Sequence, residues 1–130
     1  MKNNLAKSKK ILVIEDEEKM LNLLEERFKQ EKWIVFRAEN GKEGLETALR
    51  ERPDLIVLDI LLPKFGGLKM LEKLRKNKWG SRVSVIILTN LSSVHSVSMA
   101  LSNGVYDFLI KTDWKLEDVV EKIKQRLGHR

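Results

Sequence analysis

The chain has 130 residues, the length of a single compact domain, and a formal net charge of +6. Hydrophobic residues make up 42% and charged residues 34%, a balance typical of soluble globular proteins and unlike that of disordered or membrane-spanning chains. The absence of cysteine excludes disulfides, thiolate metal sites and cysteine nucleophiles.

The lysine-rich opening, residues 1–8, is interpreted as a basic tail that precedes a domain over 9–130. It leads straight into a strand-like run and lacks the apolar stretch of a secretory signal, so a cytoplasmic location is the default expectation. Further basic residues lie in 73–78 and 115–130, interleaved with acidic ones. This pattern favours solvated helix faces, although an anionic partner remains an alternative.

Strand and helix patterns alternate along the chain. Five apolar runs have strand length and are continuous rather than alternating, as in parallel sheets covered on both faces. In chain order they are 11–14, 33–36, 55–58, 83–88 and 108–110. After each run the apolar spacing becomes helical, and each stripe is expected to face the core. The stripes are Leu21, Leu24 and Phe28; Leu45, Ala48 and Leu49; Leu68, Leu71 and Leu74; Val94, Val97 and Leu101; and Leu116, Val119, Val120, Ile123 and Leu127.

Turn residues punctuate these elements. Asn40 and Gly41 are expected to open the second helix, Pro53 to close it, and Asn103 with Gly104 to end the fourth. Five β-α units with short connections predict an α/β fold, a doubly wound five-stranded parallel sheet of order 2-1-3-4-5, that is, a flavodoxin-like (βα)5 sandwich. In such a sheet, ligands bind beyond the carboxyl ends of the strands.

Chemically capable residues stand at four of these strand ends. The first run ends in Glu15, Asp16 and Glu17, the third in Asp59, the fourth in Thr89 and the fifth in Lys111. Each alone has an ordinary explanation, because acidic residues suit helix N-termini and a lysine after a strand is usually just exposed. Four on one edge of the sheet indicate a functional site.

The chemistry of this set can be argued directly. Three carboxylates brought together at this edge would repel one another unless a cation lay among them, and Mg²⁺ prefers such oxygen ligands. Beside Mg²⁺, a carboxylate can act as a nucleophile toward phosphorus. Asp59 would then attack, while Lys111 and the Thr89 hydroxyl would each bind a phosphoryl oxygen.

Four stretches resemble the response-regulator receiver domain of two-component signalling. They are ILVIEDEE at 11–18, DLIVLDILLP at 54–63, VIILTN at 85–90 and GVYDFLIK at 104–111. The resemblance implies that Glu15 and Asp16 bind Mg²⁺, that Asp59 is the phosphoacceptor, and that the backbone carbonyl of Leu61 is a further metal ligand. It also implies that Thr89 senses the phosphoryl group, that Lys111 pairs with it, and that Phe108 is the switch aromatic, although core packing alone would also explain Phe108.

Two positions depart from the family pattern. Thr112 replaces the proline that usually follows the lysine through a cis bond, so the Lys111–Thr112 bond is either trans or a strained cis bond. Thr112 or Asp113 could instead cap a fifth helix that begins near Trp114. Asn90 stands where the family has a small residue, and we expect it to restrict access to the phosphoryl group and to alter dephosphorylation.

The resemblance implies a signalling phosphoprotein rather than a conventional enzyme. A sensor histidine kinase or phosphotransfer protein would donate the phosphoryl group, and the fourth helix, fifth strand and fifth helix would shift and dock to a protein target. Because the sequence stops soon after the fifth helix, a stand-alone receiver without direct DNA or membrane binding is expected. A pseudo-receiver that binds proteins without phosphorylation is the main alternative. A flavin carrier is disfavoured by the acidic first loop, and a haloacid-dehalogenase-type phosphatase by Leu61, where a second acid is needed.

Overall fold

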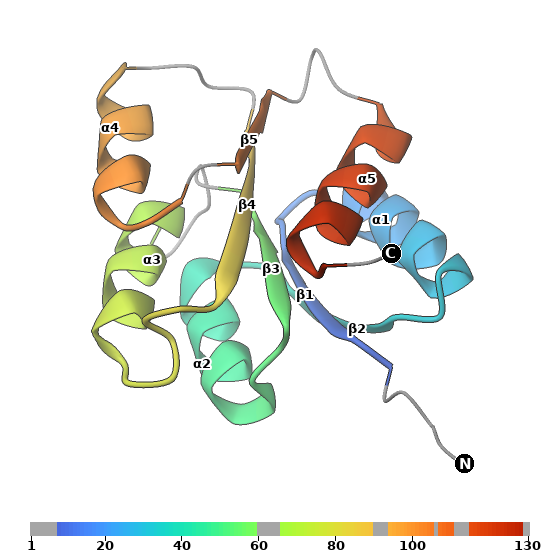
Figure 1. Ribbon diagram of the computed structural model, residues 1–130, viewed down its shortest axis with the longest axis horizontal. Helices are drawn as coiled ribbons and strands as arrows, with labels where there is room; N and C mark the ends of the chain where they lie inside the picture. Colours follow the sequence, from blue (N-terminus) through green and yellow to red (C-terminus); the bar gives the residue numbers. More distant parts are fainter. Residues whose placement is uncertain (1–7, 60–65, 90–93, 106, 111–114, 129–130) are drawn as a thin grey trace.

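The computed structural model describes residues 8–59, 66–89, 94–105, 107–110 and 115–128. Strands and helices alternate throughout this part of the chain (Figure 1). The strands are β1 (Lys10–Ile14), β2 (Ile34–Ala38), β3 (Leu55–Leu58), β4 (Ser84–Thr89) and β5 (Asp107–Ile110). The helices are α1 (Glu18–Gln30), α2 (Gly41–Glu51), α3 (Gly67–Lys76), α4 (Val94–Ser102) and α5 (Leu116–Arg126).

The five strands form one parallel sheet in the order β2-β1-β3-β4-β5, which confirms the predicted fold. Helices α1 and α5 cover one face, and α2, α3 and α4 cover the other (Figure 1). The helices lie on the two faces because each must return the chain to the start of a parallel strand, and such crossovers are almost always right-handed. All strands therefore present their carboxyl ends at the same edge.

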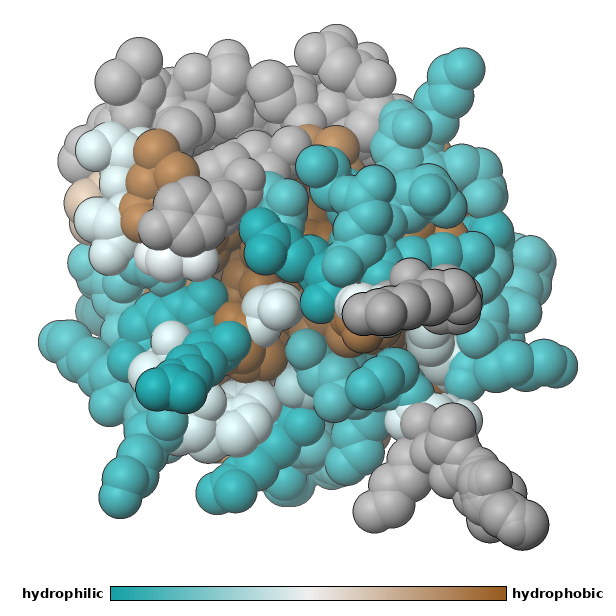
Figure 2. Space-filling model, in the orientation of Figure 1, coloured by the Kyte–Doolittle hydropathy of each residue, from teal (hydrophilic) through white to brown (hydrophobic). Residues whose placement is uncertain are grey.

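Each face of the sheet has its own hydrophobic cluster. Alternate residues of β1 point to opposite sides: Leu12 and Ile14 pack with α2, α3 and α4, whereas Ile11 and Val13 pack with α1 and α5. Both sets are almost completely buried. This two-sided burial explains why the strand sequences are continuously apolar. By contrast, the molecular surface seen in Figure 2 is mostly hydrophilic, with hydrophobic residues visible in patches between polar ones.

The residues predicted to begin and end α2, and to end α4, are confirmed. Asn40 is the N-cap of α2, and its side chain accepts a hydrogen bond of 2.8 Å from the backbone N–H of Glu43. The helix ends with Arg52 in the left-handed region, directly before Pro53. Helix α4 ends at Ser102, and Gly104 follows with φ of +77°, a conformation that glycine adopts readily.

Several boundaries and core assignments differ from the predictions. Trp33 and Val83 precede their strands rather than starting them, and β5 begins one residue earlier, at Asp107. Helix α5 begins at Leu116 with Lys115 as its N-cap. The prediction of a start near Trp114, with Thr112 or Asp113 as the cap, is therefore wrong. The backbone N–H of Lys115 donates to the Asp118 carboxylate at 2.7 Å, and this bond stabilises the later start.

Leu49 and Leu101 were predicted to face the core and are instead exposed, by 37% and 42%. Each lies one position past a fully buried alanine, Ala48 or Ala100. One residue turns the helix by about 100°, enough to rotate a side chain from the buried stripe to its margin. The apolar stripe of α2 is therefore narrower than the spacing indicated, whereas on α4 the predicted burial of Val94 and Val97 concerns side chains outside the described part of the structure.

Candidate functional site

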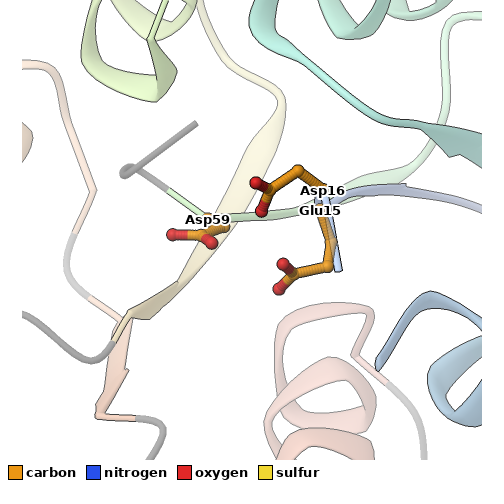
Figure 3. Close-up of side chains that lie close together, drawn as sticks. All are labelled: Glu15, Asp16 and Asp59. Carbon is orange, nitrogen blue, oxygen red and sulfur yellow. The ribbon is translucent and has the colours of Figure 1, made fainter. Parts of the chain in front are cut away.

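Three carboxylates meet at the carboxyl edge of the sheet (Figure 3). Glu15 and Asp16 follow β1, and Asp59 follows β3. The two strands are neighbours, with Ile14 paired to Leu58, so the residues after them necessarily lie side by side. One oxygen from each of the three side chains lies within 4.8 Å of the others.

Backbone hydrogen bonds fix the position of this cluster. The N–H of Asp59 donates to the carbonyl of Ile14 at 3.0 Å, and the N–H of Glu15 donates to the carbonyl of Ala38 at 3.0 Å. These bonds extend the sheet ladder by one residue beyond β1 and β3. The acidic side chains thus follow directly on hydrogen-bonded strands of the central sheet, which favours a preformed site.

Burial divides the three carboxylates. Glu15 and Asp59 are 2% and 5% exposed, whereas Asp16 is exposed. The Oε2 atom of Glu15 accepts a hydrogen bond of 3.0 Å from the backbone N–H of Glu17, the N-cap of α1. This bond was not among the predictions, although a carboxylate that accepts from the backbone N–H two residues later is a common pattern before a helix.

The donor set fits a hard divalent cation. The ligand atoms are all carboxylate oxygens, and such atoms suit Mg²⁺ better than zinc, which prefers nitrogen and sulfur. The three oxygens are near enough to one another for the carboxylates to share one cation. Asp16 is exposed, so its side chain is free to adjust toward such an ion. A cation would also offset the repulsion among three clustered carboxylates.

The structure describes the backbone position of only some of the other predicted site residues. Thr89 is the last residue of β4 and pairs with Ile110 at the same edge of the sheet, and Phe108 lies within β5. Leu61, Asn90, Lys111 and Thr112 lie outside the described residues. Their assigned roles, and the cis or trans state of the Lys111–Thr112 bond, stay predictions.

Comparison with known proteins identifies the family. Residues 11–124 match the model of the response regulator receiver domain. The chain belongs to this family. Glu15, Asp16 and Asp59 meet at one edge of the sheet, as their positions at the ends of neighbouring strands predicted, and the roles that the resemblance implies for them stay predictions.

Curated relatives include larger regulators. The probable C4-dicarboxylate response regulator DctR of Bacillus subtilis is 34% identical over 89% of this chain and 52% of its own length. The alkaline phosphatase synthesis transcriptional regulatory protein PhoP of the same organism is 36% identical over 80% of this chain and 42% of its own length. The chain thus spans about half the length of these relatives, and their names alone do not establish its output.

Solved receiver structures superpose closely on this one. A CheY-like receiver domain protein from Methanospirillum hungatei has a TM-score of 0.87 and 29% identity, covering 94% of this chain and 95% of its own. The receiver domain of a sensor histidine kinase from Pseudomonas aeruginosa has a TM-score of 0.84 and 24% identity, over 94% and 99% of the two chains. That structure has a magnesium ion coordinated in its active-site cleft.

Within the described ranges, no helix is both long enough and apolar enough to cross a bilayer.

Proposed function

We propose that this receiver accepts a phosphoryl group on Asp59 from a phosphohistidine of a sensor kinase or phosphotransfer protein, in a reaction that requires Mg²⁺. The observation that carries the proposal is the meeting of Glu15, Asp16 and Asp59 within 4.8 Å at the carboxyl edge of the sheet. Membership of the receiver family supports the same reaction. We propose residues 9–130 as the bounds of the receiver domain.

The transfer is a displacement at phosphorus. A carboxylate oxygen of Asp59 forms a new bond to phosphorus while the bond from phosphorus to the imidazole nitrogen breaks. The bonding electrons leave with that nitrogen, which then takes up a proton from water. When bound, Mg²⁺ supplies positive charge that offsets the repulsion between the carboxylates and the incoming phosphoryl oxygens.

The protein's own groups divide the remaining work. Glu15, held by the N–H of Glu17, and Asp16, which is exposed, would hold the cation. Asp59 is nearly buried, so its carboxylate is presented in a fixed direction and bulk water has limited access to it. Thr89 and Lys111 are proposed to bind the phosphoryl oxygens.

The output is proposed to be a shift of the face formed by α4, β5 and α5 toward a protein target. A new charge on Asp59 would draw Thr89 inward, and Phe108 would follow into the space that Thr89 vacates. The sheet order supports this route, because Thr89 ends β4, the strand between β3 and β5, and Phe108 lies in β5, which is part of that face.

Phosphorylation can be tested with acetyl phosphate and Mg²⁺, followed by intact-mass spectrometry. We expect the wild type to gain the mass of a single phosphoryl group, and the gain to disappear in Asp59→Asn or when the metal is chelated. Asp54→Asn is the matched control, because Asp54 lies at the opposite end of β3 and is exposed. It should be labelled like the wild type.

A folded protein that binds Mg²⁺ but gains no phosphoryl group would overturn the proposal. That outcome would favour the pseudo-receiver, which binds partners independently of phosphorylation. Labelling that persists in Asp59→Asn would instead move the acceptor to another residue.

A further inference from the structure

A cavity lies at the opposite edge of the sheet from Asp59. It lies where α3, β4, the turn before β5 and the end of α5 come together, and its volume is about 210 Å³. The residues that line it are Arg75, Ser81, Arg82, Val83, Ser84, Val85, Gly104 and Arg126. These described lining residues include three arginines and no acidic side chain.

Arg75 forms one wall of this cavity and is held rigidly. Its Nε donates to the carbonyl of Asn103 at 2.7 Å, and its Nη1 donates to the carbonyls of Gly80 and Val83 at 2.9 and 2.7 Å. Across the described part of the chain, no carboxylate forms an ion pair with this guanidinium, and Nη2 makes no hydrogen bond. Burial lowers the pKa of Arg75, because the charged form loses hydration without gaining a counterion.

Arg82 and Arg126 add charge to the same space. Arg82 is exposed and makes no ion pair among the described residues. Arg126 pairs with the carboxylate of Asp107, but Lys122 also approaches that carboxylate, at 3.5 Å between Nζ and Oδ1. Asp107 therefore pairs with two cations, and the surroundings of the cavity keep an excess of positive charge.

We propose that this cavity binds a tetrahedral oxyanion, either free phosphate or the phosphate of a phosphomonoester. Guanidinium groups present paired N–H donors that match phosphate oxygens, and such charge-assisted bonds are stronger where water is partly excluded. A volume of about 210 Å³ is well above what a single water molecule needs, so the ion fits with some hydration. The hydroxyl of Ser84 is a further donor on the wall.

This site is independent of phosphorylation at Asp59. The two sites lie at opposite ends of parallel strands, with Ser84 at the start of β4 and Asp59 directly after β3. The oxyanion site also needs no metal, because its ligands are cationic. Binding can therefore be measured in buffer without Mg²⁺, where the proposed reaction at Asp59 does not proceed.

Titration followed by ¹⁵N NMR tests the site directly. Inorganic phosphate is added without Mg²⁺, with chloride keeping the ionic strength constant, and a second series uses O-phosphoserine. We expect saturable shifts of the backbone amides of Ser81, Ser84 and Gly104. Tighter binding of phosphoserine would identify a phosphomonoester as the ligand, and tighter binding of phosphate would identify the free ion.

Two arginine variants, one in the cavity and one away from it, test whether the cavity binds the ion. Arg82→Ala should weaken binding by about tenfold or more, because it removes charge-assisted hydrogen bonds without disturbing the core. Arg50→Ala removes the same charge from an exposed position on α2 and should leave the affinity unchanged. Asp59→Asn should also bind normally. Absence of saturable shifts with both probes, or equal weakening in Arg50→Ala and Arg82→Ala, would overturn the oxyanion site.

Discussion

Arg27 on α1 and Glu117 on α5 form a two-pronged ion pair although 90 residues separate them in sequence. The two hydrogen bonds measure 2.7 Å from Nε to Oε2 and 2.8 Å from Nη2 to Oε1. The same guanidinium bonds Glu31 at 2.9 Å, and Lys124 approaches Glu31 at 3.2 Å. This network ties together the two helices that cover one face of the sheet.

The network predicts a loss of stability in acid. Hydrogen bonds from Arg27 hold the pKa values of Glu31 and Glu117 below the ordinary value of 4.5. A carboxyl whose pKa is lower in the folded state stabilises the fold above the unfolded pKa, and this contribution disappears as the pH falls through the folded pKa. Arg27→Gln should therefore unfold at lower urea than the wild type near neutral pH, and the difference should shrink below pH 4.5.

Urea unfolding at neutral and acidic pH checks this prediction, and salt provides a second test because it screens exposed pairs. Arg50→Gln is the control, since the Arg50 pair with its neighbour Glu51 joins no two elements. A difference between Arg27→Gln and wild type that stays constant from neutral to acidic pH would show that packing, not charge, carries the effect.

Asn40 should contribute about 1 kcal/mol to stability as the N-cap of α2. Its side chain accepts from the N–H of Glu43 at 2.8 Å, while the Glu43 carboxylate accepts from the N–H of Glu39 at 2.6 Å. Asn40→Ala removes the first of these bonds, whereas Asn40→Asp keeps an acceptor in place. Chemical denaturation should rank the alanine variant lowest; equal stability of the two variants would contradict the capping role.

Much of the architecture could be predicted because its signals are local. The continuous apolar runs indicate buried parallel strands, and the acids that follow β1 and β3 must then share an edge. Glu15, Asp16 and Asp59 meet as that reasoning requires. The exact starts of the strands could not be predicted from apolar runs, because buried apolar residues also occur just before a strand. Trp33 and Val83 are two such residues.

The arginine-lined cavity could not be predicted from local patterns. Arg75, Arg82 and Arg126 come from α3, the segment before β4, and α5. In sequence, each lies among mixed charges that resemble a solvated surface. Arg75 turns inward because the carbonyls of Gly80, Val83 and Asn103 accept its hydrogen bonds, and those three residues come together only after folding.

Gly80 should tolerate no side chain. A Cβ at this position would lie 2.4 Å from the backbone carbonyl oxygen of Leu74 and 2.7 Å from its side-chain Cδ1. Because Leu74 is fully buried and its backbone belongs to α3, neither group can yield easily. Gly80→Ala should cost about 2 to 3 kcal/mol in unfolding free energy, whereas exposed Ser81→Ala should have little effect. Comparable denaturation midpoints for the two variants would refute this expectation.

Metal binding should depend on Asp16 and Glu15 in different ways. Asp16 is exposed, so Asp16→Asn removes the negative charge of a ligand without disturbing the core, and isothermal titration should show Mg²⁺ affinity reduced by about tenfold or more. Glu15 is buried and accepts from the N–H of Glu17, so Glu15→Gln keeps an acceptor for that bond but loses the charge.

Both variants relieve repulsion around Asp59, and both should therefore be at least as stable as the wild type without metal. Added Mg²⁺ should then raise the melting temperature of the wild type more than that of either variant, because a ligand stabilises the state that binds it. Equal stabilisation of all three proteins by Mg²⁺ would place the metal elsewhere.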